Sequence, residues 1–244
     1  MTNAESEKAQ IRWARLAGFM YLFTYVVPVT GWIITGRLEV PGNFAETAHR
    51  IMGAELLYRF GLSCQLITSL CCIFLAMGLY VTVKPVDSNI ALFGLLFRLA
   101  ENVLNAASVI LMFVTLKLYL GAESADAFDA RRLSVLMDLY SAAKASAFYV
   151  SMTFLGMGSI LFFYLFLKSN YIPKALSALG LFASVPFTIV SFVYLLWPQY
   201  EKRLQLGWLP MAAAEISVGL WLLIKGVNLQ ARKEQAGAAV QLRP

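Results

Sequence analysis

The sequence predicts an all-α protein, a polytopic integral membrane bundle with about six transmembrane helices. The first observation is composition: 59% of the 244 residues are hydrophobic and 14% are charged, whereas soluble domains average about 45–50% and about 25%. The second is a mean hydropathy of +0.68. The third is that the apolar residues gather in six runs, each near the roughly 20 residues that a helix needs to cross a bilayer.

The predicted membrane domain is a single unit, residues 16–226, between polar tails at residues 1–15 and 227–244. The first run, residues 16–35, is too long for the apolar part of a signal peptide, and no small-residue cleavage site follows it. We therefore expect a retained first helix. Connectors that carry Pro, Gly, Lys or Arg separate the later runs. The later predicted spans are residues 57–83, 90–116, 145–167, 175–197 and 208–224.

Two connectors, after the first and third spans, are longer and carry apolar residues at helical spacing. In the first, Asn43 precedes Glu46 by three residues, a spacing that resembles a capping box. The second covers residues 124–140. Both are too polar to cross a membrane. We expect two amphipathic helices that lie at the interface or extend the helices that follow them.

The formal net charge is +6, and the basic residues stand mainly at the ends of the apolar runs. Residues in such places contact phospholipid headgroups and set topology, so the expected partner is the lipid bilayer and not a nucleic acid. Basic residues divide ten to nine between the two sides, but several on the second side stand near acids, as Arg50 does near Glu46. This pattern favours both termini in the cytoplasm. The sequence carries no signal of an oligomeric state.

We expect neither a metal site nor a cofactor. Cys64, Cys71 and Cys72 share one apolar run, and His49 is the single histidine, so no set of zinc ligands is available. The sequence contains no HExxH, GxSxG or Walker motif. The segment Gly156-x-Gly158-Ser159 lies in mid-span, and we interpret it as a surface for close helix packing.

Ionisable residues inside the spans are the first candidates for function, because each costs at least roughly 2.5–3.5 kcal/mol at the centre of a membrane helix. Glu215 lies in the sixth span. The third span carries a polar face, at a spacing of three to four residues, formed by Arg98, Glu101, Asn102, Asn105 and Ser108. At about 1.5 Å per residue, Glu101 and Glu215 lie about 17 and about 19 Å from the same membrane surface.

One arginine and two glutamates leave one negative charge unbalanced. A proton on one carboxyl would neutralise it, and so would a further cation such as Lys144 or Arg59, the latter four residues after Glu55. We hypothesise two roles for this group: an interior polar pocket or a structural clasp between helices. The group consists of Arg98, Glu101, Asn102, Asn105 and Glu215.

Three classes of function fit these residues. The first is a transporter of a small solute or of protons, for which the buried acids would exchange a proton. The second is a non-catalytic membrane protein that binds a small molecule, a lipid or a protein partner. The third is a membrane-embedded enzyme that uses the acids on a lipid-like substrate. No motif assigns a catalytic residue.

The chain resembles the bacterial membrane proteins grouped as domain of unknown function 4386. The resemblance runs from about residue 15 to residue 228 and rests on "RLAGFMYLFTYVV", "LEVPGNFAETAHRIMGAELLYRFGL", "LLFRLAENVLNA", "YLFLKSNYIPKALSALGLFAS" and "AEISVGLWLLIKGVN". It implies a multi-pass fold in the bacterial cytoplasmic (inner) membrane and no particular activity. It also implies that Arg59, Arg98 and Glu215 belong to a shared framework. Asn170 stands where the family commonly has glycine.

Overall fold

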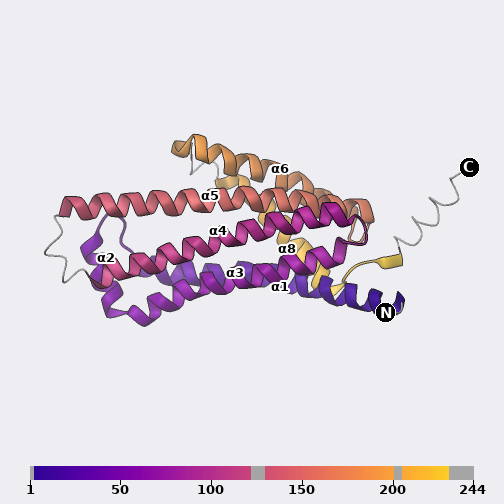
Figure 1. The fold of residues 1–244 in the computed structure, drawn as a ribbon, viewed down its shortest axis with the longest axis horizontal. Helices are drawn as coiled ribbons and strands as arrows, with labels where there is room; N and C mark the ends of the chain where they lie inside the picture. The colour runs from indigo at the N-terminus through magenta and orange to yellow at the C-terminus, as the bar shows by residue number, and fades with distance from the viewer. Residues whose placement is uncertain (1–2, 122–129, 201–204, 231–244) are drawn as a thin grey trace, which may run out of the picture.

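The computed structural model describes residues 3–121, 130–200 and 205–230, and all regular structure in these ranges is helical (Figure 1). Two short 3-10 helices, η2 (Pro198–Tyr200) and η3 (Gln205–Trp208), precede the last helix. The α-helices are α1 (Asn3–Leu38), α2 (Phe44–Gly53), α3 (Glu55–Val83), α4 (Ser88–Leu120), α5 (Ala130–Ser169), α6 (Lys174–Leu196) and α8 (Leu209–Ile224).

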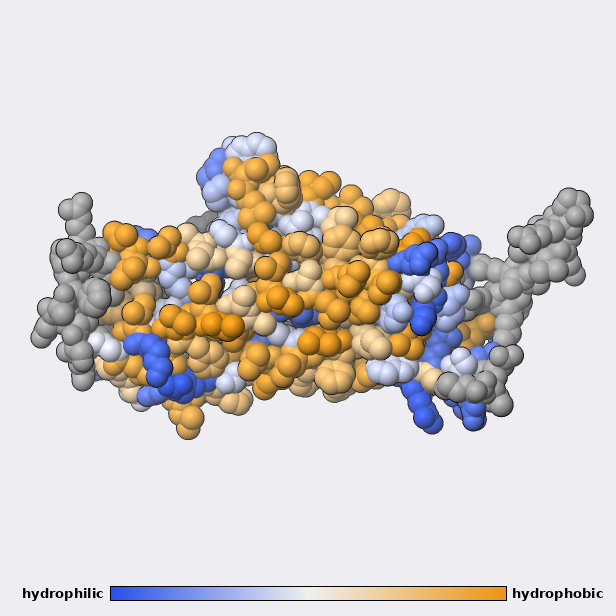
Figure 2. All heavy atoms as spheres, viewed as in Figure 1, coloured by the Kyte–Doolittle hydropathy of each residue, from blue (hydrophilic) through white to orange (hydrophobic). Residues whose placement is uncertain are grey.

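Six of these helices, all except α2, are long and apolar enough to cross a membrane. They coincide with the six predicted spans, and α3 and α6 begin or end within two residues of the predicted limits. Figure 2 shows hydrophobic side chains over the middle of one face and hydrophilic ones toward the two ends. Large apolar side chains stand exposed on the outside of the bundle, among them Val103 (69%) and Phe182 (76%). Lipid-facing helices have this pattern. The prediction of an all-α fold with six helices long and apolar enough to cross a membrane is confirmed for the described residues.

The six long helices form a ring. Each packs most extensively on its neighbours in the order α1, α3, α4, α5, α6, α8, and α8 returns to α1. Close contact of small residues closes the ring, since a β-carbon added to Gly18 would lie 2.6 Å from the carbonyl oxygen of Gly219. We call the end where α1 begins and α8 ends the terminal end, and the opposite end the α2 end (Figure 1).

Local chemistry explains where several helices begin and end. The Asp87 carboxylate accepts hydrogen bonds from the backbone N–H groups of Asn89 and Ile90, both at 3.1 Å, and so caps α4. The Asn43 side chain accepts from the Glu46 N–H at 3.0 Å, as the spacing predicted for the start of α2. After α5, Asn170 has a φ of 54°, a left-handed conformation that asparagine tolerates and glycine favours.

The start of α1 differs from the sequence-based expectation, and the second long connector takes one of its two expected forms. The α1 helix begins at Asn3, so the described part of the polar tail is helical and continuous with the first span. The second connector, residues 124–140, was expected to lie at the interface or to extend the helix that follows it, and its described part takes the second form, as the beginning of α5. No proline or glycine interrupts residues 130–155, so the helix continues into the span. Residues 124–129 lie outside the described residues.

The α2 helix is the separate element that the first long connector predicted. Ala48 and Ile51 are buried against Tyr58 of α3 and Leu116 of α4, in a small apolar core at the α2 end. The opposite face of α2 exposes side chains such as His49. A larger core fills the terminal end of the ring and contains Phe162, Phe163 and Phe166 of α5. The space between these two cores is the site described next.

Candidate ligand-binding cavity

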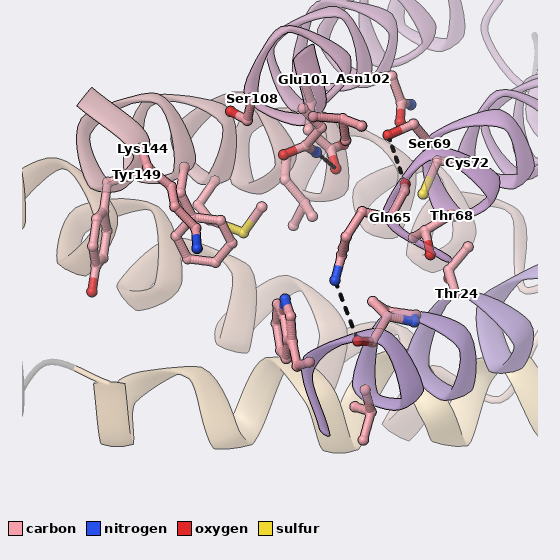
Figure 3. A pocket seen from close by; sticks show the side chains of 18 of the residues that line it. Thr24, Gln65, Thr68, Ser69, Cys72, Glu101, Asn102, Ser108, Lys144 and Tyr149 are labelled. Carbon is pink, nitrogen blue, oxygen red and sulfur yellow. Dashed lines mark hydrogen bonds between the residues drawn. The ribbon is translucent and has the colours of Figure 1, made fainter. Parts of the chain in front are cut away.

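A cavity of about 870 Å³ lies inside the helix ring between the two cores (Figure 3). It has walls from α1, α3, α4, α5 and α8, with Phe187 from α6 and Trp208 from η3. One face of α1 contributes residues at helical spacing: Tyr21, Thr24, Tyr25, Pro28, Val29 and Trp32. Figure 3 shows side chains of α3, such as Gln65 and Thr68, opposite Lys144 and Tyr149 of α5. The polar face predicted on the third span lines this cavity.

The cavity is closed toward the terminal end and exposed toward the α2 end. Tyr21 and Leu75 lie at the closed end and are 2% and 1% exposed. Beyond them the large apolar core begins. Toward the α2 end the lining residues Val29 and Trp32 are 45% and 52% exposed, and Ser141 of α5 is exposed as well. A molecule would therefore enter at the α2 end, between the halves of α1 and α5 that lie nearer that end.

Arg98 and Glu101 form a buried ion pair at the closed end. The distance from Arg98 Nη1 to Glu101 Oε2 is 3.2 Å, and the side chains are 3% and 2% exposed. The N–H groups do not point at the carboxylate, so neither atom of the pair has a hydrogen-bond partner in the described chain. The Arg98 Nε atom is also unpaired. The pair neutralises charge but leaves hydrogen-bonding capacity unused.

Glu215 reaches the same end of the cavity from α8. The Tyr25 hydroxyl donates a hydrogen bond of 2.7 Å to Glu215 Oε2, and Ser159 of α5 also hydrogen-bonds the Glu215 carboxyl. The other oxygen, Oε1, is buried without a partner. Glu215 has no ion pair within 4.0 Å among the described residues. Its direct partners are thus hydroxyl groups, and Arg98 acts on it from beyond contact distance.

The two asparagines extend the polar floor along α4. The Asn102 side chain donates to the Arg98 carbonyl oxygen at 2.8 Å, and its Oδ1 atom stays buried and unpaired. The Asn105 amide donates to Glu101 Oε1 at 3.5 Å, and Asn105 Oδ1 accepts a hydrogen bond of 3.0 Å from Ser151. These contacts fix the direction of the Glu101 carboxylate.

Six of the seven buried side-chain atoms without a partner in the described chain belong to residues that line this one cavity, and the seventh is Asn170 Oδ1 after α5. Each buried polar atom without a partner costs about 1–3 kcal/mol, so several in one place need an explanation. Their positions indicate that a molecule inside the cavity, water or a ligand, supplies the missing hydrogen bonds. The atoms are Arg98 Nε and Nη1, Glu101 Oε2, Asn102 Oδ1, Trp208 Nε1 and Glu215 Oε1.

The further partners expected for this cluster separate into two groups. Lys144 lines the cavity, but near its exposed end (Figure 3). Arg59 and Glu55 do not line it and instead pair with each other at 2.6 Å on the surface of α3. Their side chains are 37% and 40% exposed. They lie one turn apart at the α2 end of α3, too far along the helix to reach the closed end of the cavity.

Several residues of the site carried no recognised signal in the sequence. Gly158 was interpreted as a packing residue, and here it makes room for Arg98, because an added β-carbon would lie 3.0 Å from Arg98 Cγ. Ser159 of the same motif bonds Glu215. Tyr25 gave no signal, because a tyrosine in an apolar run looks like an interfacial or packing residue until its partner is known.

An aromatic wall covers one side of the cavity. The Trp208 ring lies 5.4 Å from Phe148, 5.5 Å from Tyr149 and 5.9 Å from Phe187 between centroids. Tyr149 also stacks on Tyr194 of α6 at 3.4 Å. These contacts hold the indole in place while its N–H remains unpaired. Within the described ranges, no group of three or more His, Cys, Asp or Glu residues could hold a metal ion.

Residues 16–226 match the family described as Domain of unknown function (DUF4386). The match covers nearly the whole membrane domain, so the chain belongs to this family, and the resemblance inferred from the sequence is confirmed. No curated protein and no solved structure matches the chain.

Proposed function

We propose that this member of the DUF4386 family is a multi-pass protein of the bacterial cytoplasmic membrane that binds a small molecule in its central cavity. The molecule has a polar head, placed against Arg98, Glu101 and Glu215, and an apolar body, placed against the aromatic wall. The observation that carries the proposal is the set of buried polar atoms that the protein leaves unpaired around one cavity. A purely structural clasp would pair them.

The size and lining of the cavity support a ligand of this kind. Small-molecule sites are mostly apolar hollows of about 300–1,000 Å³ with a few convergent polar groups. The cavity of about 870 Å³ has polar groups at one end and side chains such as Met112, Met152 and Met211 along its length. Unbranched methionine side chains adapt to the shape of a bound molecule.

The experiment that tests the proposal compares the small molecules that purify with three forms of the protein. Each form is isolated in mild detergent and extracted with solvent, and the extract is analysed by mass spectrometry. Ser108→Trp fills the cavity, because Ser108 lines it. Ala107→Trp is the matched control, because Ala107 is the exposed neighbour on the same helix.

We expect at least one compound that is retained by the wild type and by Ala107→Trp and is lost from Ser108→Trp. Identical extracts from the wild type and Ser108→Trp, with both proteins folded, would contradict the proposal. If the wild type chemically alters the retained compound during incubation and Glu215→Gln does not, the protein is instead a membrane-embedded enzyme.

Proton-linked transport of the bound molecule is a second candidate. The feature that favours it is Glu215, an acid with one unpaired oxygen at the closed end of a one-sided cavity. An intramembrane acid of this kind marks many proton pathways. Liposomes that contain the protein and a pH-sensitive dye test it. Addition of the retained compound should start a proton flux in wild-type liposomes and not in Glu215→Gln liposomes, whereas equal leak in liposomes with and without protein would refute it.

The proposed orientation places both termini in the cytoplasm, with the cavity open toward the other side. Basic residues in the short connectors at the terminal end, Lys84, Lys168 and Lys174, support it. A version without native cysteines is labelled in intact cells with a membrane-impermeant maleimide. Glu46→Cys should react at once and Ser88→Cys only after lysis, and the reverse order would overturn the orientation.

A further inference from the structure

With both glutamates ionised, the charged groups at the closed end of the cavity sum to one negative charge. Arg98 balances Glu101, since their charged groups are 3.2 Å apart. Glu215 has no cation within 4.0 Å among the described residues, and its partners are the neutral hydroxyls of Tyr25 and Ser159. A buried carboxylate without a counter-charge is costly. A positively charged group on a ligand would lower this cost.

The other charged residues of the lining stand too far away to balance Glu215. Ser159 bonds Glu215 and so marks its level on α5, and Lys144 precedes Ser159 by fifteen residues on the same continuous helix. Fifteen helical residues span about 22 Å. Glu39 lies just beyond the end of α1 at the opposite end of the cavity from Tyr21. The formal charges of Glu39 and Lys144 sum to zero, so the net charge at the closed end persists.

The aromatic wall continues from this charge along the cavity. Trp208 precedes Glu215 by seven residues, two helical turns, so it lies about 10 Å further along the same face. Four aromatic rings line this part of the cavity, and the Trp208 ring lies within 5.9 Å of the other three between centroids: Phe148, Tyr149 and Phe187. Aromatic rings attract organic cations and pack against apolar bodies. An inorganic cation has no apolar body that could pack against these rings.

Resting on the proposed function, we infer that the ligand is an organic monocation, an ammonium group on an apolar body. The ammonium lies against the unpaired Oε1 of Glu215, and the body lies along Trp208 and Tyr149. Such a ligand restores charge balance at the closed end. It also replaces the missing hydrogen bond of Glu215 with a charge-assisted N–H donor.

Three probes with the same body and different heads test the inference. These are 4-phenylbutylamine, 4-phenylbutanol and 4-phenylbutyrate, which carry a positive, a neutral and a negative head at pH 7. Binding to the full chain is measured by calorimetry in dodecyl maltoside, a detergent that has no charge. We expect the amine to bind at least tenfold more tightly than the alcohol and the carboxylate to bind most weakly.

Substitutions assign the preference to Glu215. Glu215→Gln retains an oxygen acceptor for Tyr25 but removes the charge, so the amine should then bind within about twofold of the alcohol. Glu46→Gln removes the same charge from α2, outside the cavity, and should leave the preference unchanged. The comparison of the three probes on the wild type stands even if Glu215→Gln does not fold.

The outcomes separate this inference from the proposed function. Equal affinity for amine and alcohol, or tightest binding of the carboxylate through Arg98, would overturn the cation and leave the binding cavity intact. Absence of binding by all three probes would overturn the inference, while the extraction experiment decides the proposed function independently. Phosphatidylethanolamine carries a phosphate as well as an ammonium and so has no net charge. Competition by it would overturn the monocation, and we expect no competition by it or by phosphatidylglycerol.

Discussion

Removal of the Arg98 charge is the most informative perturbation of the buried cluster. In Arg98→Met, the Glu101 carboxylate loses a cation at 3.2 Å, and both side chains are almost fully buried at 3% and 2% exposure. Loss of one partner from a buried ion pair costs about 3–5 kcal/mol. At about 2–4 °C per kcal/mol for a chain of this size, we expect Tm to fall by about 6–20 °C.

The assay is thermal unfolding followed by intrinsic tryptophan fluorescence in detergent, with Arg59→Met as the matched control. Arg59 also pairs with a glutamate on its own helix, at 2.6 Å, but both side chains are more than a third exposed. Such a pair contributes about 0.2–0.5 kcal/mol, so its Tm should change by less than about 2 °C. The double variant Arg98→Met/Glu101→Gln should be more stable than Arg98→Met alone. Equal Tm values for Arg98→Met and Arg59→Met would refute the reasoning.

Three further predictions concern single contacts and use the same Tm assay. Tyr25→Phe removes a 2.7 Å hydrogen bond to the buried Glu215 carboxylate and should lower the free energy of unfolding by about 1.5–3 kcal/mol. An unchanged Tm would show that the Glu215 carboxylate does not depend on the Tyr25 hydroxyl. Gly18→Ala would place a β-carbon against the Leu223 backbone nitrogen and should destabilise the protein by about 1–3 kcal/mol. Gly36→Ala, with nothing within 4 Å of its added β-carbon, should not, and similar effects of the two would disprove close packing at the α1–α8 contact. Asn170→Gly should keep or raise Tm, because φ is 54° there and Oδ1 is buried and unpaired. Asn170→Ala should lower the stability by about 1 kcal/mol, and the opposite order of the two Tm values would contradict the left-handed turn.

The helices were predictable because their signal is local. Apolar runs of membrane length set the six spans, and the Asn43–Glu46 spacing marked the start of α2. For the second connector the sequence left two alternatives, a helix at the interface or an extension of the next span, because residues 130–144 are polar enough to resemble a separate surface helix. The helix continues from residue 130 into the span because no helix-breaking residue occurs before Gly156.

The candidate site was predictable only where polarity is unusual for a membrane span. Arg98, Glu101 and Glu215 stood out because charge is rare there. Their neighbours Gly158 and Tyr25 did not, because their role depends on which helices are adjacent in the ring. Helix adjacency is a property of tertiary packing that a single sequence does not encode at any fixed spacing. The same reason explains why Arg59 was considered as a partner of the cluster although it lies beside Glu55.

The central claim is that the protein holds a small molecule between Glu215 and Trp208. The most direct measurement is a crystal structure of the wild-type chain grown from a lipidic phase, with the density inside the ring analysed before any ligand is added. We predict continuous non-protein density that contacts Glu215 Oε1 and extends along the Trp208 ring. A ring interior filled by side chains of α1 and α5, with Glu215 paired directly to Arg98, would contradict the claim and make the cluster a structural clasp.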